Sequence, residues 1–126
     1  MVQAVSTDRA PKPAGHYSQA IVAGGQIYIS GQLPIRPDGV PLADSDFAMQ
    51  AEQAIANVLA ILDAAGGTPA TLVRVTGYIV GIEHWPRFNA IYARLLGDAR
   101  PARTVVPVPE LHHGYLVEVD AIATLA

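Results

Sequence analysis

The sequence predicts an α+β domain in which a single sheet carries two helices on one face. Three observations predict it. Runs of strand-forming residues occur near both ends and in the middle of the chain, helical periodicity occurs twice, and the elements follow the order strand, strand, helix, strand, helix, strand, strand. The chain has 126 residues, of which 51% are hydrophobic, so we expect one domain over residues 1–126 with its own core.

The N-terminal part is expected to hold an arm and then a hairpin. The first fifteen residues contain the stiff segment "APKPAG" and predict an irregular arm. In "YSQAIVAGGQIYISGQLPI" (17–35), two strand-forming runs are separated by Gly24-Gly25, which is a hairpin signal. Asp38-Gly39 then marks the tip of a turn.

The two helices have recognisable ends. Asp44, Ser45 and Asp46 offer N-caps before an apolar pattern that recurs at helical spacing from 47 to 65, and Gly66-Gly67 ends it. The segment "TLVRVTGYIV" (71–80) alternates like a strand. A second helix is expected from about His84, with a proline tolerated in its first turn, to Gly97; its aromatic residues Trp85, Phe88 and Tyr92 are typical of packing.

The chain is expected to close with strands at "RTVVPV" (103–108) and "YLVEVDAIATL" (115–125), joined by "PELHHG". Pro107 and Pro109 remove backbone donors, which predicts an edge or bulged strand there. In one trial antiparallel register, Arg103 lies opposite Asp120 and diagonal to Glu118; a slip of one residue separates them onto opposite faces. The pattern leaves two interpretations of Arg103: an exposed ion pair with Asp120, or a site for an anion beside an acid–base glutamate.

Composition excludes several function classes. There is no cysteine, so disulfides and Cys-ligated metal sites are ruled out, and the formal net charge of −3 comes without a Lys/Arg stripe for nucleic acid. No apolar run is long enough for a membrane span and the N-terminus lacks a signal-peptide core, so we expect a soluble, cytoplasmic protein. His112 and His113 are adjacent and would point apart on an extended chain, which favours a turn or cleft-rim role over a metal site. The sheet face without helices is expected to be apolar and to be covered by another subunit.

Five segments, in order, resemble the Rid family, also called YjgF-like: "YSQAI", "YISGQLP", "FNAIYARLL", "RPARTVV" and "VEVDAIATL". The resemblance covers about residues 10 to 125. It implies a chorismate-mutase-like fold, a homotrimer with clefts between subunits, and no metal or organic cofactor. RidA-type members hydrolyse reactive enamine and imine acids, such as 2-aminoacrylate and 2-iminopropionate, to the 2-oxo acid and ammonia.

The family's functional residues carry over onto matching positions. The arginine that binds the substrate carboxylate falls on Arg103, and the glutamate that positions or activates water falls on Glu118. Further substrate-binding positions fall on Tyr17, Ser30, Gly31 and Asn89, and Val105 occupies a substrate-binding position two residues after the arginine.

The sequence departs from the family pattern in places that bear on the substrate. His16 replaces a proline, Val105 replaces a cysteine that many members have, and Pro107 and Pro109 bracket Val108. The alternatives left open are a relative that deaminates a larger substrate such as 2-aminomuconate, and a small-carboxylate-binding module without turnover. A ribonuclease role, which the wider family has been given, is disfavoured by the pI of about 5.7 and the scattered basic residues.

Overall fold

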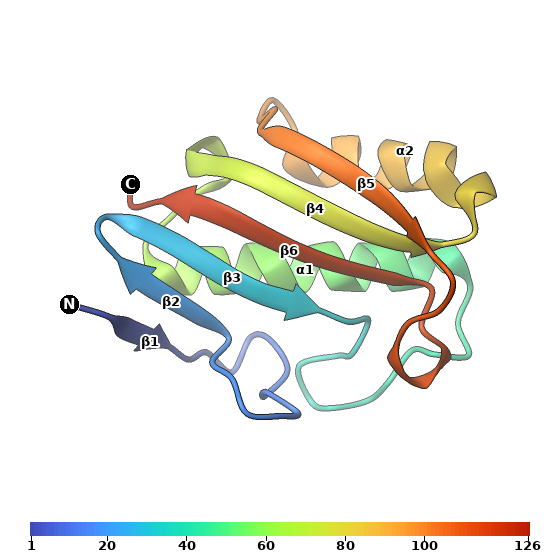
Figure 1. The fold of residues 1–126 in the computed structure, drawn as a ribbon, viewed down its shortest axis with the longest axis horizontal. Helices are drawn as coiled ribbons and strands as arrows, with labels where there is room; N and C mark the ends of the chain where they lie inside the picture. The colour runs from blue at the N-terminus through green and yellow to red at the C-terminus, as the bar shows by residue number, and fades with distance from the viewer.

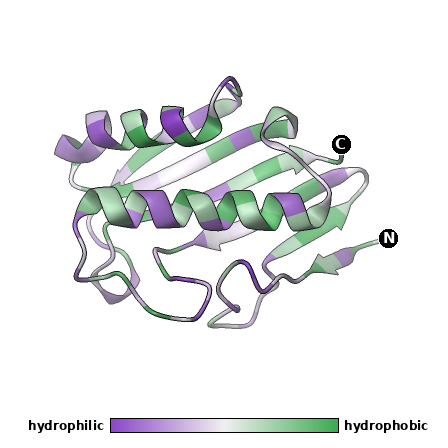
Figure 2. Ribbon diagram, turned by 180° about the vertical axis from the view of Figure 1, so that it is seen from behind, coloured by the Kyte–Doolittle hydropathy of each residue, from purple (hydrophilic) through white to green (hydrophobic).

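A computed structural model describes residues 1–126 as one six-stranded sheet with two helices. Its elements are β1 (Gln3–Val5), β2 (Ala20–Ala23), β3 (Gln26–Gln32), α1 (Phe47–Ala65), β4 (Leu72–Val80), α2 (Trp85–Leu96), β5 (Ala102–Val108) and β6 (Val117–Thr124). Both helices lie on one face of the sheet, behind it in Figure 1 and in front of it in Figure 2. The α+β prediction, with both helices on the same face, is therefore confirmed.

The last strand of the chain lies in the middle of the sheet. The strand order is β1-β2-β3-β6-β4-β5, and β6 pairs antiparallel with both β3 and β4. Only β4 and β5 pair in parallel. This parallel pair is joined by α2, as a crossover between parallel strands requires.

The predicted chain turns and helix ends follow local chemistry. Gly24 and Gly25 have φ of 58° and 77°, which lets them close the β2–β3 hairpin in two residues. The side chain of Asp46 accepts a hydrogen bond from the backbone N–H of Met49 and caps α1, and Gly66 ends the helix in the left-handed region. Gly97 ends α2.

The core lies between the helices and the sheet. Alternation in β6 turns Val117, Val119, Ala121 and Ala123 toward the helices, where all four are buried. In α2, Phe88 is fully buried above Gly77 of β4, and a Cβ atom at Gly77 would lie 2.7 Å from the Phe88 ring. The close approach of α2 to the sheet therefore depends on that glycine.

Three expectations about the sheet are corrected. The N-terminal arm contains a short edge strand, β1, which pairs antiparallel with β2. The two closing strands do not form a hairpin, because β4 lies between β5 and β6. The uncovered face is not purely apolar: the alternation that buries the valines and alanines of β6 leaves Glu118 and Asp120 on the open face, beside Tyr78 of β4. The edge position predicted for the proline-containing strand is confirmed.

Candidate functional site

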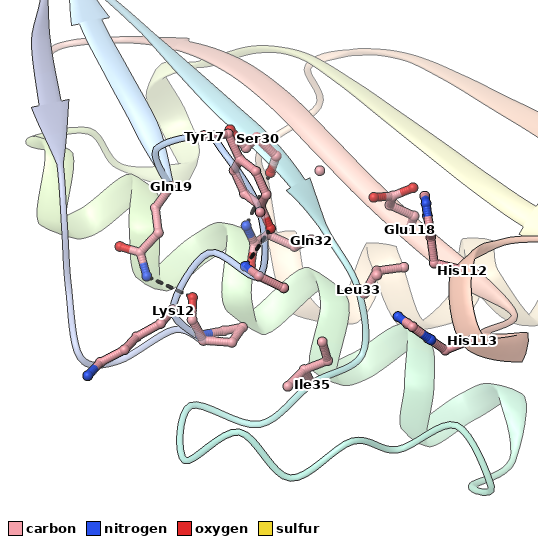
Figure 3. Close-up of a pocket in the computed structure, with 14 residues that line it drawn as sticks. Lys12, Tyr17, Gln19, Ser30, Gln32, Leu33, Ile35, His112, His113 and Glu118 are labelled. Carbon is pink, nitrogen blue, oxygen red and sulfur yellow. Dashed lines mark hydrogen bonds between the residues drawn. The ribbon is translucent and has the colours of Figure 1, made fainter.

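The first candidate site is a cavity of about 410 Å³ beside the end of β3 and the start of β6. Figure 3 shows the N-terminal arm on one side of this cavity and the turn before β6 on the other. Its polar lining comes from Lys12, Tyr17, Gln19, Ser30, Gln32, His112, His113 and Glu118. The cavity thus brings together four predicted positions, Tyr17, Ser30, Gly31 and Glu118.

Glu118 is the only carboxylate of this cavity. It lies on the open face of β6, half-buried, and Gly31 of β3 makes the room for it: a Cβ atom at Gly31 would lie 2.6 Å from Oε2 of Glu118. Burial raises the pKa of the Glu118 carboxyl; the neighbouring His112 lowers it and Asp120 adds to the rise. A carboxylate with a raised pKa is suited to accepting a proton near neutral pH.

The two hydroxyl groups of the cavity differ in which hydrogen bonds they can still form. Ser30 donates its hydroxyl proton to the carbonyl of Ser18 at 2.6 Å, so its oxygen remains only as an acceptor. The Tyr17 hydroxyl accepts a hydrogen bond from the backbone N–H of Ala14 at 3.3 Å and keeps its own proton free to donate. Tyr17 is therefore the available hydroxyl donor on this side.

The arm that carries Tyr17 is fastened by a buried glutamine. Gln19 is 2% exposed; its side-chain amide donates to the carbonyls of Thr7 and Pro11, and its side-chain oxygen accepts from the N–H of Thr7. These bonds hold an irregular segment against the sheet, since they satisfy backbone groups that no strand partner reaches.

The second candidate site is a separate cavity of about 440 Å³ between α2 and β5. It contains Arg103, whose Nη1 donates to Oδ1 of Asn89 at 2.9 Å. The guanidinium also lies over the Tyr92 ring, 4.8 Å from its centroid, and 5.9 Å from that of Trp85. No carboxylate pairs with this guanidinium, which therefore retains donors for an anion.

The ion-pair interpretation of Arg103 with Asp120 is wrong in this fold. Arg103 pairs in register with Val75 of β4, which faces the helices, whereas Asp120 pairs with Thr76 on the open face. Asp120 instead accepts a hydrogen bond from the Tyr78 hydroxyl at 3.1 Å. Burial raises the pKa of the Asp120 carboxyl, and the bond from Tyr78 opposes the rise.

Two positions that the resemblance marked lie outside both cavities. Val105 shares a face of β5 with Arg103 but packs against the core, and His16 lines neither cavity.

The turn before β6 brings in residues that had no assigned function. His112 and His113 do not point apart, because residues 112–114 form a 3-10 turn rather than extended chain, and both imidazoles line the Glu118 cavity. A cleft-rim position, which the sequence favoured for them, is thereby confirmed. No group of three or more metal-ligating side chains occurs in the chain. Neither helix is long and apolar enough to cross a bilayer.

Comparisons with known proteins agree with this fold and with these motifs. The family model described as endoribonuclease L-PSP matches residues 7–125. A RutC family protein of Pyrococcus horikoshii is 39% identical over 123 residues, 98% of each chain. RidA from an Antarctic Psychrobacter superposes with a TM-score of 0.92 at 36% identity, covering 98% of this chain and 99% of its own. Escherichia coli TdcF, solved with bound serine, gives 0.90 at 29% identity with the same coverage. The fold is thus the chorismate-mutase-like fold of these proteins, and the chain belongs to the Rid (YjgF-like) family.

Proposed function

We propose that this protein hydrolyses reactive imine and enamine acids, such as 2-iminopropionate and 2-aminoacrylate, to 2-oxo acids and ammonia. One observation carries the proposal: a Rid-family chain holds a half-buried glutamate in one cavity and an arginine without a carboxylate partner in another. A deaminase of this kind needs those two groups, one for the substrate carboxylate and one for water. The RidA relative supports the reaction class, and the serine bound to TdcF supports a small amino-acid-like ligand.

The active site requires more than one copy of the chain. Arg103 faces α2, while Glu118 lies on the opposite face of the same sheet. One copy therefore cannot present both side chains to a substrate of a few atoms. We propose that Arg103 of one copy meets the Glu118 cavity of its neighbour in a homotrimer, whose closed rotation gives three equal sites.

In this mechanism, Arg103 binds the substrate carboxylate with its planar fork and orients the adjacent C=N carbon, while Asn89 holds the fork in place. Glu118 takes a proton from water as the water oxygen bonds to that carbon, and the C=N electron pair moves to nitrogen. The protonated glutamate then returns the proton to the nitrogen, which gives a carbinolamine with a hydroxyl and an amino group on the same carbon. Glu118 next takes the hydroxyl proton and passes it to the amino nitrogen, so that the C–N bond breaks, ammonia leaves with the bonding pair, and an oxygen electron pair forms the C=O bond of the 2-oxo acid. Tyr17 donates its free hydroxyl proton to the oxygen or nitrogen of the intermediate.

The test generates 2-iminopropionate with an amino acid oxidase acting on alanine and traps the imine with semicarbazide. The wild type is expected to speed the loss of trappable imine, and Arg103→Ala and Glu118→Gln are each expected to abolish that effect. Arg87→Ala is the matched control, because Arg87 is an exposed arginine of α2. Turnover that survives both site substitutions would contradict the proposed roles.

A larger substrate, such as 2-aminomuconate, is the second candidate. The Glu118 cavity alone, at about 410 Å³, falls in the range of sites for drug-sized ligands and exceeds what a three-carbon acid fills. His112 and His113, in the turn before β6, form part of its wall. Assay of both substrates decides between the candidates. If the enzyme turns over only the larger acid, the proposed reaction stands and the proposed substrate is replaced. The cytoplasm remains our proposed location.

A further inference from the structure

The turn before β6 is anchored at its end by a buried tyrosine and by backbone hydrogen bonds. Tyr115 follows the turn and is 3% exposed. The backbone N–H of Leu116 donates to the side-chain oxygen of Gln50 at 2.9 Å, and Gln50 is fully buried in α1. The carbonyl of Leu116 accepts from the N–H of Val80 at 2.9 Å. His112 therefore starts a turn whose end is held by both a helix and a strand.

The backbone of this turn adopts an unfavourable conformation. His113 has a φ of 58°, the only positive value at a residue other than glycine, and Gly114 follows at 77°. A left-handed residue with a side chain costs on the order of 1 kcal/mol and persists only where its surroundings fix it. This conformation places both imidazoles in the wall of the Glu118 cavity.

We propose that His112 acts together with Glu118: its imidazole faces the carboxylate in the cavity, and the two side chains together hold the water that attacks the substrate. Figure 3 shows the two side chains next to each other at one end of the cavity. No direct hydrogen bond or ion pair joins them, so both side chains keep polar atoms free for a bridging water. This inference rests on the proposed deaminase function.

The charge around Glu118 supports the pairing. Among the titratable groups that face the carboxylate, Asp120 lies on the same strand and Tyr78 on β4. The others are Tyr17 and Lys12 of the arm and His112 and His113 of the turn. Of these, His112 lowers the pKa of Glu118, opposing the effects of burial and of Asp120, whereas His113 has no such effect. Adjacent histidines of the same cavity thus differ in their relation to the carboxylate.

The difference supplies a matched pair of variants, His112→Asn and His113→Asn. Asparagine tolerates the left-handed backbone of residue 113, so both variants are expected to fold. In His112→Asn, kcat is expected to fall roughly ten- to hundredfold, because the water loses one of its two partners. The acid limb of kcat/KM is expected to move to higher pH, while KM changes little because Arg103 still binds the carboxylate. His113→Asn is expected to keep the acid limb at its wild-type pH, and Arg87→Ala, at an exposed position of α2, is the control for kcat.

An acid limb that stays in place in His112→Asn overturns the inference, as does an equal shift in both variants, because a merely structural role of the turn would give either result. A 13C titration of the Glu118 carboxyl gives a second measurement that needs no turnover. Its midpoint is expected to rise in His112→Asn alone, and an unchanged midpoint overturns the pairing. If the wild type deaminates no imine acid, the proposed function fails, and the titration still decides whether His112 and Glu118 act together.

Discussion

Two inactive variants of this protein are expected to restore activity to each other when their copies are mixed. Arg103→Ala keeps an intact Glu118 cavity, and Glu118→Gln keeps an intact arginine cavity. The two residues lie on opposite faces of one sheet, so in the proposed homotrimer each site takes its arginine from one copy and its glutamate from the next. A mixed trimer therefore contains some sites with both wild-type residues.

The expected recovery follows from counting. In a random one-to-one mixture, about half of the arginine positions and about half of the glutamate positions are wild-type, so about one quarter of the sites are complete. If both residues acted within one chain, no site would be complete. A second mixture, wild type with the double variant Arg103→Ala/Glu118→Gln, separates the cases again: about one quarter of the sites are complete if they are shared, and about one half if they are not.

The assay unfolds the two variants together in urea, refolds them, and measures imine loss against refolded wild type at equal protein. The same variants refolded separately and then combined serve as the control for exchange without unfolding. Activity near one quarter in both mixtures is expected. Refolded mixed trimers with no activity in the first mixture and one half in the second would refute the shared site.

Four further predictions concern the glutamate cavity and the contact between α2 and the sheet. Because burial raises the pKa of Glu118, and the proposed mechanism uses its ionised form, kcat/KM is expected to fall as pH falls through that raised pKa; a pH–rate profile of the wild type without an acid limb would contradict this. The contribution of Glu118 to folding stability is fully present below the carboxyl pKa of the unfolded chain, about 4.3, and is lost as pH rises through the raised pKa of the folded chain. Glu118→Gln should therefore raise the free energy of unfolding at neutral pH, as measured by urea titration. Gly31→Ala would place a Cβ atom 2.6 Å from Oε2 of Glu118, the end of a flexible side chain; we expect kcat to drop at least about tenfold with a melting temperature near wild type, and unchanged kcat would contradict this. Gly77→Ala meets the buried Phe88 ring at 2.7 Å, which cannot yield in the same way, so the unfolding free energy in urea should fall by about 1–3 kcal/mol.

Local features of the fold were predictable because their causes are local. The N-cap Asp46, the left-handed Gly66 and the Gly24-Gly25 turn each depend on residues within one turn of chain. The alternation of β6 likewise puts Glu118 and Val119 on opposite faces of the sheet. The N-terminal arm was different. The strand β1 has only three residues, and its partners in β2 lie at least fifteen positions further along the sequence, so no local pattern predicts the pairing.

The partner of β5 was the main feature that the sequence left open. Apolar residues occur on both faces of "RTVVPV", so alternation does not say which face α2 covers. An eight-residue connection to β6 is compatible with either a hairpin or a step across one strand. The signal that favoured the second was the helix between β4 and β5, since a strand–helix–strand unit normally gives parallel neighbours.

That parallel pairing explains why Arg103 and Glu118 lie on opposite faces of the sheet. Arg103 pairs with Val75, and Val75 pairs with Ala121, so the arginine shares a face with Ala121 and not with Glu118, which is three residues away on an alternating strand. A hairpin between β5 and β6 would have allowed both charges on one surface, where each would neutralise the other. Because the sheet separates the two residues, Arg103 has no carboxylate partner in its own chain, and Glu118 has no guanidinium beside it. In the proposed homotrimer, each half of the site binds the substrate only when a second copy brings the other half, so we expect assembly to be a condition for activity and not only for stability.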